Sequence, residues 1–528
     1  MTDRDNRNEL VWGAENQQKL YDTKVMVVGS DILSQMILAG CAGLSVGHIN
    51  FVDNKRISRQ ERDFLCLHSN ESIGQKKVRH IEETLKKINA TLTVHDRTLR
   101  GIYSKFTEAF VYGCKPELII DGTNDPISKE KALNYAIQYN IPFISASSDN
   151  EKSAVAAYFP VNTGKIAVIP EKPDLEALLM KEFEGSRQEG FTSGVMAGIV
   201  CEEIRKLKFK YTDNGQDDNL PSNERIVYNL YSGLRKGMKS DEGSAPVYFK
   251  NKKALIVGGG GIGNFVALDL ALLGLGHIDI LDLDTVEGHN LNRQVLLYDR
   301  VGQRKADVLA DRVKELDPVI QSDSIFGKIG EVYIERDKDW LERLYEEDKK
   351  MWNEKDPTKR EPVFPKFREY VKEKYELNIG DREKGVNALV KEQEIASRGY
   401  DIIFGCLDNK YARLWLNNFA VNYTIPYIDG GTGPKSGQLA VYVPGKTKCI
   451  DCQMHLINYP PPRSCAEGPE GSVVMSNLVI GSMMVGEAIR AMYSIGSPIL
   501  SDLKYTVMLK DRFFLRTRKG VLATEHKC

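Results

Sequence analysis

Short apolar runs alternate along the chain with glycines and with longer apolar stretches. From residue 254, the run ALIV is followed by a glycine cluster, then by the stretch NFVALDLALLGLG and by a second short run, HIDILDLD. Continuous apolar strands that alternate with helices are typical of a mostly parallel sheet covered on both faces. The pattern therefore predicts an α/β fold.

The same pattern occurs twice in the chain. A stretch ending at Asp53 aligns without a gap with a stretch ending at Asp282, which places Gly29 on Gly258. Further matches follow in the same order: GQKK with GQRK, ELIIDGTND with DIIFGCLDN, IPFIS with IPYID, and CEEIRKL with GEAIRAM. Self-similarity of this kind marks a repeated structural unit. We therefore expect two Rossmann-like, doubly wound halves that form a pseudo-dimer.

Composition shifts predict the boundaries of the two halves. We expect a first domain at 1–240, a polar linker at 241–249 and a second domain at 250–528. The segment at about 331–398 has no counterpart in the first half and is rich in Lys, Glu, Trp and Tyr, so we interpret it as a helical insertion. It is either a solvated decoration or a docking surface for a protein substrate, and the sequence leaves both open.

Charge and hydropathy exclude several classes of function. The formal net charge of the 528 residues is -1, which gives no reason to expect nucleic acid as a partner. The N-terminus is polar, and no apolar run approaches the roughly 20 residues of a membrane span. Nine cysteines without a secretion signal point to a reducing compartment. We expect a cytoplasmic protein that does not contact membranes.

The glycine cluster of the second half is a candidate nucleotide site. It follows a strand and opens a helix, and its members are Gly258, Gly260, Gly261 and Gly263. Glycines allow the backbone to approach a phosphate, and a helix N-terminus offers free N–H groups to it. Asp282, at the end of the next strand, has the position of a ribose-binding carboxylate. A nicotinamide or flavin enzyme would have the same fingerprint.

Charged residues downstream distinguish these options. Asn290, Arg293, Gln294 and Lys305 follow the ribose position, and Asp408 follows the later strand DIIFG. Cations neutralise charge that develops on phosphates, and a carboxylate is a hard oxygen ligand suited to magnesium. The set favours chemistry at the α-phosphate of ATP with Mg over hydride transfer.

In this order, the motifs GGGGIG, NLNRQ, GQRK, CLDN, IPYIDGGTGPKSGQ and KCIDC resemble those of the ubiquitin-activating enzymes and their bacterial relatives, the adenylyltransferases of sulfur-carrier proteins. The resemblance implies that Asp282 binds ribose and that Asp408 holds magnesium. It assigns the triphosphate to Asn290, Arg293, Gln294 and Lys305. It also implies a partner with a C-terminal glycine, either a ubiquitin-like or a sulfur-carrier protein, whose carboxylate is adenylated.

The first half departs from the same pattern. Its loop reads Gly-Ser-Asp-Ile from Gly29, which puts the carboxylate of Asp31 where a phosphate would lie, so we expect no ATP there. The resemblance nevertheless gives this half a role, because the family's inactive half lends an arginine to the partner's nucleotide. Arg7, five residues before Trp12, has that position. The alternative is an exposed arginine on a frayed terminus.

The cysteines of the second half offer a nucleophile and a metal site, in a loop at about 449–472. Cys465 lies in a Pro/Gly-rich stretch before a helix, near Arg463, and such surroundings favour a thiolate. Its resemblance to a family cysteine implies a thioester after adenylation. In relatives a CxxC pair such as Cys449 and Cys452 holds zinc with a second pair. Here only Cys528 stands in for that second pair, with His526 as a candidate fourth ligand. The alternative is that Cys449 or Cys452 accepts the acyl group.

Other interpretations stay open at this stage. Adenylation of a peptide or a sulfur-carrier protein without conjugation fits the same site, and a conjugating enzyme is a further candidate partner only if a thioester forms. A nicotinamide oxidoreductase is disfavoured by the phosphate-directed charges. A non-catalytic scaffold is disfavoured by the intact glycine cluster.

Overall fold

The computed structural model describes 3–58, 64–65, 72–93, 98–102, 106, 111, 113–160, 174–209, 225–231, 233–236, 249–327, 329, 390–408, 410–433, 437–454, 456, 471–494, 499–504 and 514–519. The residues 241–248 of the expected linker and 331–389 of the expected insertion lie outside these ranges, so both domain boundaries stay predictions. Within the insertion range, residues 392–396 are helical.

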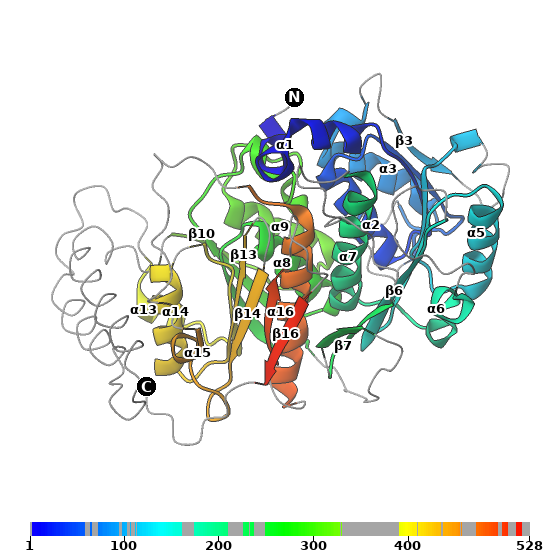
Figure 1. Cartoon of the computed structure of the whole chain (residues 1–528). Helices are drawn as coiled ribbons and strands as arrows, with labels where there is room; N and C mark the ends of the chain where they lie inside the picture. Colours follow the sequence, from blue (N-terminus) through cyan, green and yellow to red (C-terminus); the bar gives the residue numbers. More distant parts are fainter. Residues whose placement is uncertain are drawn as a thin grey trace.

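The first half forms an eight-stranded sheet with helices on both faces (Figure 1). The strand order is β3-β2-β1-β4-β5-β6-β7-β8; the first five are parallel and the last three antiparallel. Its elements are η1 (Asp3–Asp5), α1 (Asn6–Tyr21), β1 (Lys24–Val28), α2 (Ile32–Leu44), β2 (His48–Val52), α3 (Lys77–Ile88), η2 (Ala90–Thr93), β3 (Thr98–Ile102), β4 (Leu118–Asp121), α5 (Pro126–Gln138), β5 (Phe143–Ser148), β6 (Lys152–Tyr158), α6 (Leu175–Leu179), η4 (Lys181–Phe183), α7 (Gly190–Lys208), β7 (Ile226–Asn229) and β8 (Gly233–Lys236).

The second half repeats this topology strand for strand. Its sheet has the order β11-β10-β9-β12-β13-β14-β15-β16, again with five parallel strands and three antiparallel ones. Its elements are β9 (Lys253–Val257), α8 (Gly261–Leu273), β10 (His277–Asp282), η5 (Gly288–Asn290), η6 (Val295–Leu297), α9 (Lys305–Leu316), β11 (Ser324–Phe326), α13 (Glu392–Ala396), β12 (Ile402–Gly405), α14 (Lys410–Asn422), β13 (Tyr427–Thr432), β14 (Gly437–Tyr442), α15 (Ile450–Met454), α16 (Val474–Tyr493), β15 (Ile499–Lys504) and β16 (Phe514–Lys519). The predicted fold class, two Rossmann-like halves, is confirmed.

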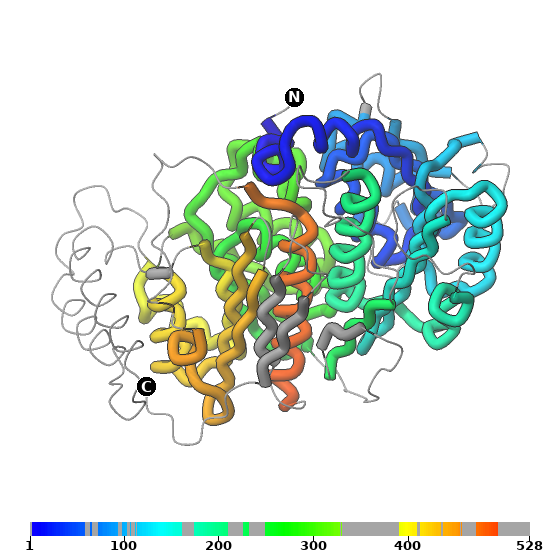
Figure 2. Tube along the Cα trace, in the orientation of Figure 1, coloured from blue at the N-terminus to red at the C-terminus, as the bar shows by residue number. Residues whose placement is uncertain are grey.

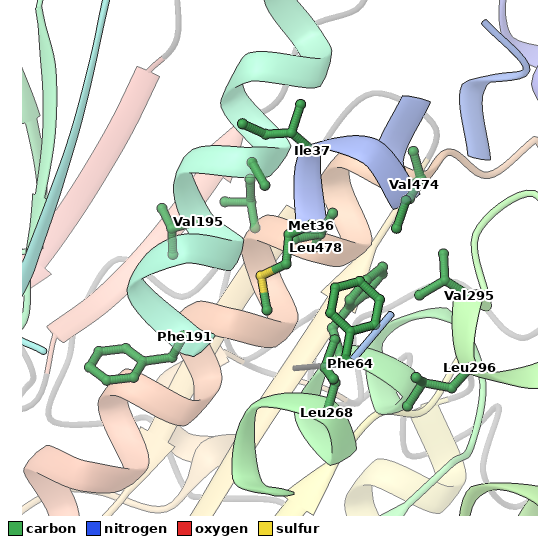
Figure 3. Close-up of a cluster of buried hydrophobic side chains, with 14 of the residues drawn as sticks. Met36, Ile37, Phe64, Phe191, Val195, Leu268, Val295, Leu296, Val474 and Leu478 are labelled. Atoms are coloured by element: carbon green, nitrogen blue, oxygen red, sulfur yellow. The ribbon is translucent and has the colours of Figure 1, made fainter. Parts of the chain in front are cut away.

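One hydrophobic core serves both halves. Side chains of α2 and α7 from the first half interleave with side chains of α8 and α16 from the second half, as Figure 3 shows for Met36, Val195, Leu268 and Leu478. The other face of each sheet has a separate cluster, under α5 and α6 in the first half and under α13, α14 and α15 in the second. The pseudo-dimer is therefore held together by a continuous apolar interior. None of the described helices is long and apolar enough to cross a membrane.

Small residues let the central helices approach closely. A Cβ atom at Gly198 of α7 would lie 2.5 Å from Val479 Cγ2 of α16, and one at Gly194 would overlap the Ser482 hydroxyl. Within the second half, a Cβ at Gly481 would lie 2.8 Å from Phe265 Cβ. Interiors packed at this density lose stability when side-chain volume is added.

A carboxyl group is buried where the two halves meet. Asp269 of α8 is fully inaccessible to solvent, beside Ser482 of α16 and the backbone of Gly190 at the start of α7. Burial raises the pKa of Asp269 to about 8, and the nearby charge of Glu189 adds to the rise. The carboxyl group is thus protonated in the folded protein at neutral pH.

This buried acid predicts a pH-dependent stability. Unfolded Asp269 ionises above about pH 4 while the folded side chain stays protonated up to about pH 8, so folding loses about 1.4 kcal/mol per pH unit in that window. We expect the urea midpoint of the wild type to fall relative to that of Asp269→Asn between pH 5 and pH 7.5. Fluorescence-monitored unfolding at both pH values measures this, and parallel pH profiles would contradict it.

Candidate nucleotide site

The glycine loop of the second half lies between β9 and α8, at the point where the strand order reverses. β9 is paired with β10 on one side and with β12 on the other, and ligands of doubly wound sheets bind at the carboxyl ends of such strands. Gly258 has φ +99°, and a Cβ there would overlap the carbonyl oxygen of Cys406 after β12. A Cβ at Gly263 would overlap the carbonyl oxygen of Gly258. Both positions therefore require glycine.

The first turn of α8 leaves its backbone N–H groups available to a ligand. Asn264 Nδ2 donates to the carbonyl oxygens of Gly259 and Gly260, at 3.0 and 2.9 Å, which engages acceptors rather than donors of the loop. A Cβ at Gly261 would lie 2.5 Å from Asn477 Oδ1 of α16, so this glycine is needed for helix packing. A Cβ at Gly260 would meet only Gln294 Nε2, at 4.0 Å. The space over Gly260 is thus open on the side where an anion would approach.

Asp282 lies at the end of β10 and faces the same loop. Its Oδ2 accepts from the backbone N–H of Gly259 and its Oδ1 from that of Asp284, both at 2.6 Å. Burial raises the pKa of Asp282, against the opposing charge of Lys305 and these two hydrogen bonds. The carboxylate is fixed in orientation beside the glycines.

Gln294 and Lys305 extend the site beyond the loop. Gln294 is 2% exposed, and its Oε1 has no hydrogen-bond partner among the described residues. An orphaned amide oxygen beside Gly260 fits a bound ligand with a donor group. Lys305, at the start of α9, is also buried, and its Nζ donates to Asp284 Oδ2 at 2.8 Å. Asp284 is half exposed, so this ion pair leaves the ammonium group at the edge of the site.

Asn290 has a structural role that the sequence did not reveal. Its Oδ1 accepts from the backbone N–H of Glu287 at 3.0 Å, which forms a capping box for η5. This bond helps to shape the turn that carries Arg293. One atom of Asn290 is thus engaged within the protein.

Two arginines from different halves meet beside this turn. Arg7 Nη2 lies 3.2 Å from His289 Nε2, and Arg293 Nη1 donates to the His289 carbonyl oxygen at 3.0 Å. Arg293 Nη1 also donates to Asn292 Oδ1 at 2.8 Å. Burial and, second, the charge of Arg7 lower the pKa of Arg293 to about 10, so the Arg293 guanidinium group remains charged at neutral pH. Like charges held together in this way favour a bound anion.

The N-terminal segment is anchored firmly across the junction of the halves, where Figure 2 shows it in dark blue. Arg4 is buried and donates to the carbonyl oxygens of Ile88 and Ala42, both at 2.7 Å. Asn8 Oδ1 accepts from Asn292 Nδ2 of the second half at 2.7 Å. Arg7 therefore does not lie on a frayed terminus.

Asp408 is exposed, three residues beyond the end of β12. Its preceding turn is fixed by Arg413, which donates to the Leu407 carbonyl oxygen at 2.6 Å and forms an ion pair with the buried Asp429 at 3.1 Å. Cys406 packs against Gly258, and burial raises the pKa of its thiol well above its usual range. An exposed carboxylate two residues after Cys406, which packs against the glycine loop, fits a magnesium ligand, and Cys406 itself is a packing residue.

The first half keeps the loop but closes it with its own charges. The Asp31 carboxylate forms an ion pair with Lys55 Nζ, at 2.5 and 2.7 Å to its two oxygens. Ser30 Oγ donates to Asp53 Oδ2 at 2.8 Å, where Asp282 in the second half instead binds a loop amide. Phe64, which aligns with Arg293, is buried in the shared core. In the first half, the position that a phosphate would occupy is thus lined by the Asp31 carboxylate and its partner Lys55.

The cysteines considered as nucleophile or zinc ligands either lie apart from the nucleotide site or fall outside the described residues. Cys449 is fully buried and Cys452 partly buried, in the cluster on the sheet face turned away from the first half. Within the described ranges, no third His, Cys, Asp or Glu joins them at ligand distance; the only such group there is His277, Asp279 and Asp323. Two thiols alone do not make a four-ligand zinc site. Cys465 and Cys528 lie outside the described residues.

The sequence reasoning missed several residues that shape the site. They are Asn264, His289, Asn292, Arg413 and Asn477. Buried polar residues in apolar helices were a signal for Asn264 and Asn477, because such residues are retained when they satisfy backbone groups. His289 and Asn292 gave no signal of their own, since their partners Arg7 and Asn8 belong to the other half.

Comparison with known proteins shows the family of this chain. Residues 5–244, 248–347 and 371–521 match the ThiF family. The SUMO-activating enzyme subunit uba-2 of Caenorhabditis elegans is 27% identical over 205 residues, which is 38% of this chain and 25% of that protein. The adenylyltransferase and sulfurtransferase MOCS3 of Drosophila sechellia is 26% identical over 256 residues, 48% of this chain and 43% of that protein. The Nedd8-activating enzyme E1 catalytic subunit of Drosophila melanogaster is 26% identical over 226 residues, 39% and 37% of the two chains.

Each of these matches spans less than half of the relative's length. Among solved structures, that of E. coli MccB with ATP matches 52% of this chain and 66% of its own, at 21% identity and a TM-score of 0.34. At this TM-score, residue roles do not transfer from that structure.

Proposed function

We propose that this chain, which belongs to the ThiF family, uses ATP to adenylate the C-terminal carboxylate of a ubiquitin-like protein. The observation that carries the proposal is the meeting of Arg7 and Arg293, from different halves, in a turn whose next residue, Gln294, lies near Gly260 of the glycine loop. The relatives named SUMO- and Nedd8-activating enzymes and adenylyltransferase support the same class of reaction.

In the proposed reaction the phosphates of ATP bind the amides of residues 260–263, because those of Gly258 and Gly259 are donated to Leu281 and Asp282. Asp282 accepts from the ribose hydroxyls. The partner's carboxylate attacks the α-phosphorus, the bond to the β-phosphate oxygen breaks, and pyrophosphate leaves. The negative charge that develops on the phosphates is stabilised by Arg293 and Arg7, which are already held in place before the reaction, and by Lys305. Gln294 Oε1, which lacks a partner among the described residues, accepts a hydrogen bond from the nucleotide.

Asp408 is proposed to hold magnesium, which supplies positive charge to the phosphates when bound. Arg413 fixes the turn before it, so the carboxylate keeps its place at the carboxyl end of β12. Lys305 leaves Asp284 for a phosphate oxygen, because Asp284 is half exposed and is readily solvated. Zinc held by Cys449, Cys452 and Cys528 belongs to the proposal only as a structural ion, and no step depends on it.

We further propose that Cys465 takes the acyl group from the adenylate as a thioester and that AMP leaves. A conjugating enzyme would then receive the acyl group. The relatives named activating enzymes support this second step, whereas the relative named adenylyltransferase and sulfurtransferase supports a sulfur-carrier substrate without conjugation.

Cys465→Ala separates these two outcomes. We expect it to leave ATP–pyrophosphate exchange within about twofold of the wild type, because the thiol acts after adenylation, and to abolish a thiol-sensitive adduct with the partner. The measurement uses small β-grasp proteins ending in Gly-Gly as candidate partners, with exchange and non-reducing gels read from the same samples.

Cys452→Ala is the matched control, because its thiol is the alternative acceptor. An adduct that survives in Cys465→Ala and is lost in Cys452→Ala would move the nucleophile to α15. Exchange that occurs without any added protein or peptide would contradict the proposed substrate class.

A further inference from the structure

His289 connects the two arginines of the site. Its ring faces Arg7, with 3.2 Å between His289 Nε2 and Arg7 Nη2, and its backbone carbonyl oxygen accepts from Arg293 Nη1 at 3.0 Å. On the other side of the ring, Nδ1 lies 3.2 Å from Glu287 Oε2. The residue is partly buried and lies in η5, immediately before the NLNRQ motif. His289 thus contacts Arg7 through its ring and Arg293 through its backbone carbonyl oxygen.

These contacts define the state of the ring. A guanidinium group is only a donor, so Nε2 must be unprotonated to accept from Arg7. A carboxylate is only an acceptor, so the hydrogen of the neutral ring belongs on Nδ1, where it is donated to Glu287. Only the neutral Nδ1–H tautomer satisfies both neighbours.

We propose that His289 is a positioning residue whose neutral ring holds the Arg7 guanidinium at the nucleotide site, and that protonation of this ring releases Arg7. The charged groups that face the ring are Arg7 and Asp3 from the N-terminal segment, and Glu287 and Arg293 from its own turn. A protonated ring would place an N–H against the N–H groups of Arg7 and add a third positive charge. Acid therefore breaks the contact.

The charges around the ring agree with this geometry. Burial and the positive charges of Arg7 and Arg293 lower the pKa of His289, and the charges of Glu287 and Asp3 oppose that shift. The contact is thus present at neutral pH and is lost on the acidic side. Its consequence for catalysis rests on the function proposed above, whereas the contact itself can be tested without ATP.

The first test is a histidine NMR titration of the full-length protein without nucleotide. The His289 resonance is assigned by its absence in His289→Gln. We expect Arg7→Ala to raise the pKa of His289, because a neighbouring positive charge is removed. An unchanged pKa of His289 in Arg7→Ala would overturn the inference, whatever the protein's activity.

The second test is pyrophosphate exchange across pH, with the matched control His80→Gln, whose ring contacts Gln75 in the first half. We expect His289→Leu to lower the exchange rate about tenfold at pH 7.5, through loss of one hydrogen bond to a charged group. His289→Gln keeps an acceptor that does not titrate. We therefore expect it to retain most of the exchange rate at pH 7.5 and to lose less of that rate at acidic pH than the wild type does. In an Arg7→Ala background, His289→Leu should cause no further loss.

Two outcomes separate the inference from the proposed function. Additive losses for Arg7→Ala and His289→Leu would overturn the inference, because the two residues would then act independently. Full activity of Arg7→Ala would instead overturn the proposed role of Arg7 in catalysis, and the titration would still decide whether His289 holds that side chain.

Discussion

Arg293→Ala is expected to lower the rate of ATP–pyrophosphate exchange by at least about a hundredfold. This is the usual effect of removing a preorganised positive group that stabilises a developing anion. Arg293 is held by the His289 carbonyl oxygen and by Asn292 Oδ1, so its guanidinium is oriented before the nucleotide arrives. Steady-state exchange at saturating ATP measures the effect. Arg293→Lys should recover only part of the rate, because an ammonium group keeps the charge but not the planar fork.

Arg300→Ala is the matched control for this substitution. Arg300 lies seven residues further along the same segment, where it pairs with Asp299 and Glu315 at 3.5 Å. We expect it to leave exchange unchanged, since it contacts none of the groups assigned to the nucleotide. Exchange that persists in Arg293→Ala would contradict the assignment of the triphosphate site.

Gly260→Ala is expected to weaken ATP binding by roughly tenfold to a hundredfold and to leave thermal stability nearly unchanged. Gly260 has φ -77° and precedes α8, so alanine fits its backbone, and the added Cβ would meet only Gln294 Nε2 at 4.0 Å. The folded protein therefore tolerates the methyl group, but a phosphate at the loop does not. Calorimetric titration with ATP and thermal unfolding of the same variant measure the two quantities.

Gly113→Ala is a suitable control, because a Cβ there meets nothing within 4 Å and its φ is not positive. It lies in the first half, away from the loop, and should change neither quantity. An affinity for ATP that is unchanged in Gly260→Ala would show that the open space over this residue does not receive the nucleotide.

The fold could be predicted because its signals are local and repeated. The run ALIV, the glycines and the apolar stretch from Asn264 became β9, the loop and α8, with Asp282 at the end of β10 as expected. The internal repeat predicted a second copy of this unit, and the two sheets share one strand order. Spacing alone was sufficient, since each feature lies within one βαβ unit.

The contacts between the halves could not be predicted in the same way. Arg7 and His289 are 282 positions apart, and only the docking of the N-terminal segment brings them together. The sequence predicted a carboxylate in the loop of the first half, but it gave no indication that Lys55 would neutralise Asp31. Likewise, Asn477 meets Gly261 only because α16 packs against α8. Such pairs depend on tertiary packing, which no local pattern encodes.

The continuous interior shared by α2, α7, α8 and α16 makes the first half part of the structural support of the second half. If the first half were deleted, the apolar flank of the second half would be left in water, and Arg7 would be lost with it. The first half therefore covers this apolar flank and supplies one side chain, Arg7, to the turn that carries Arg293.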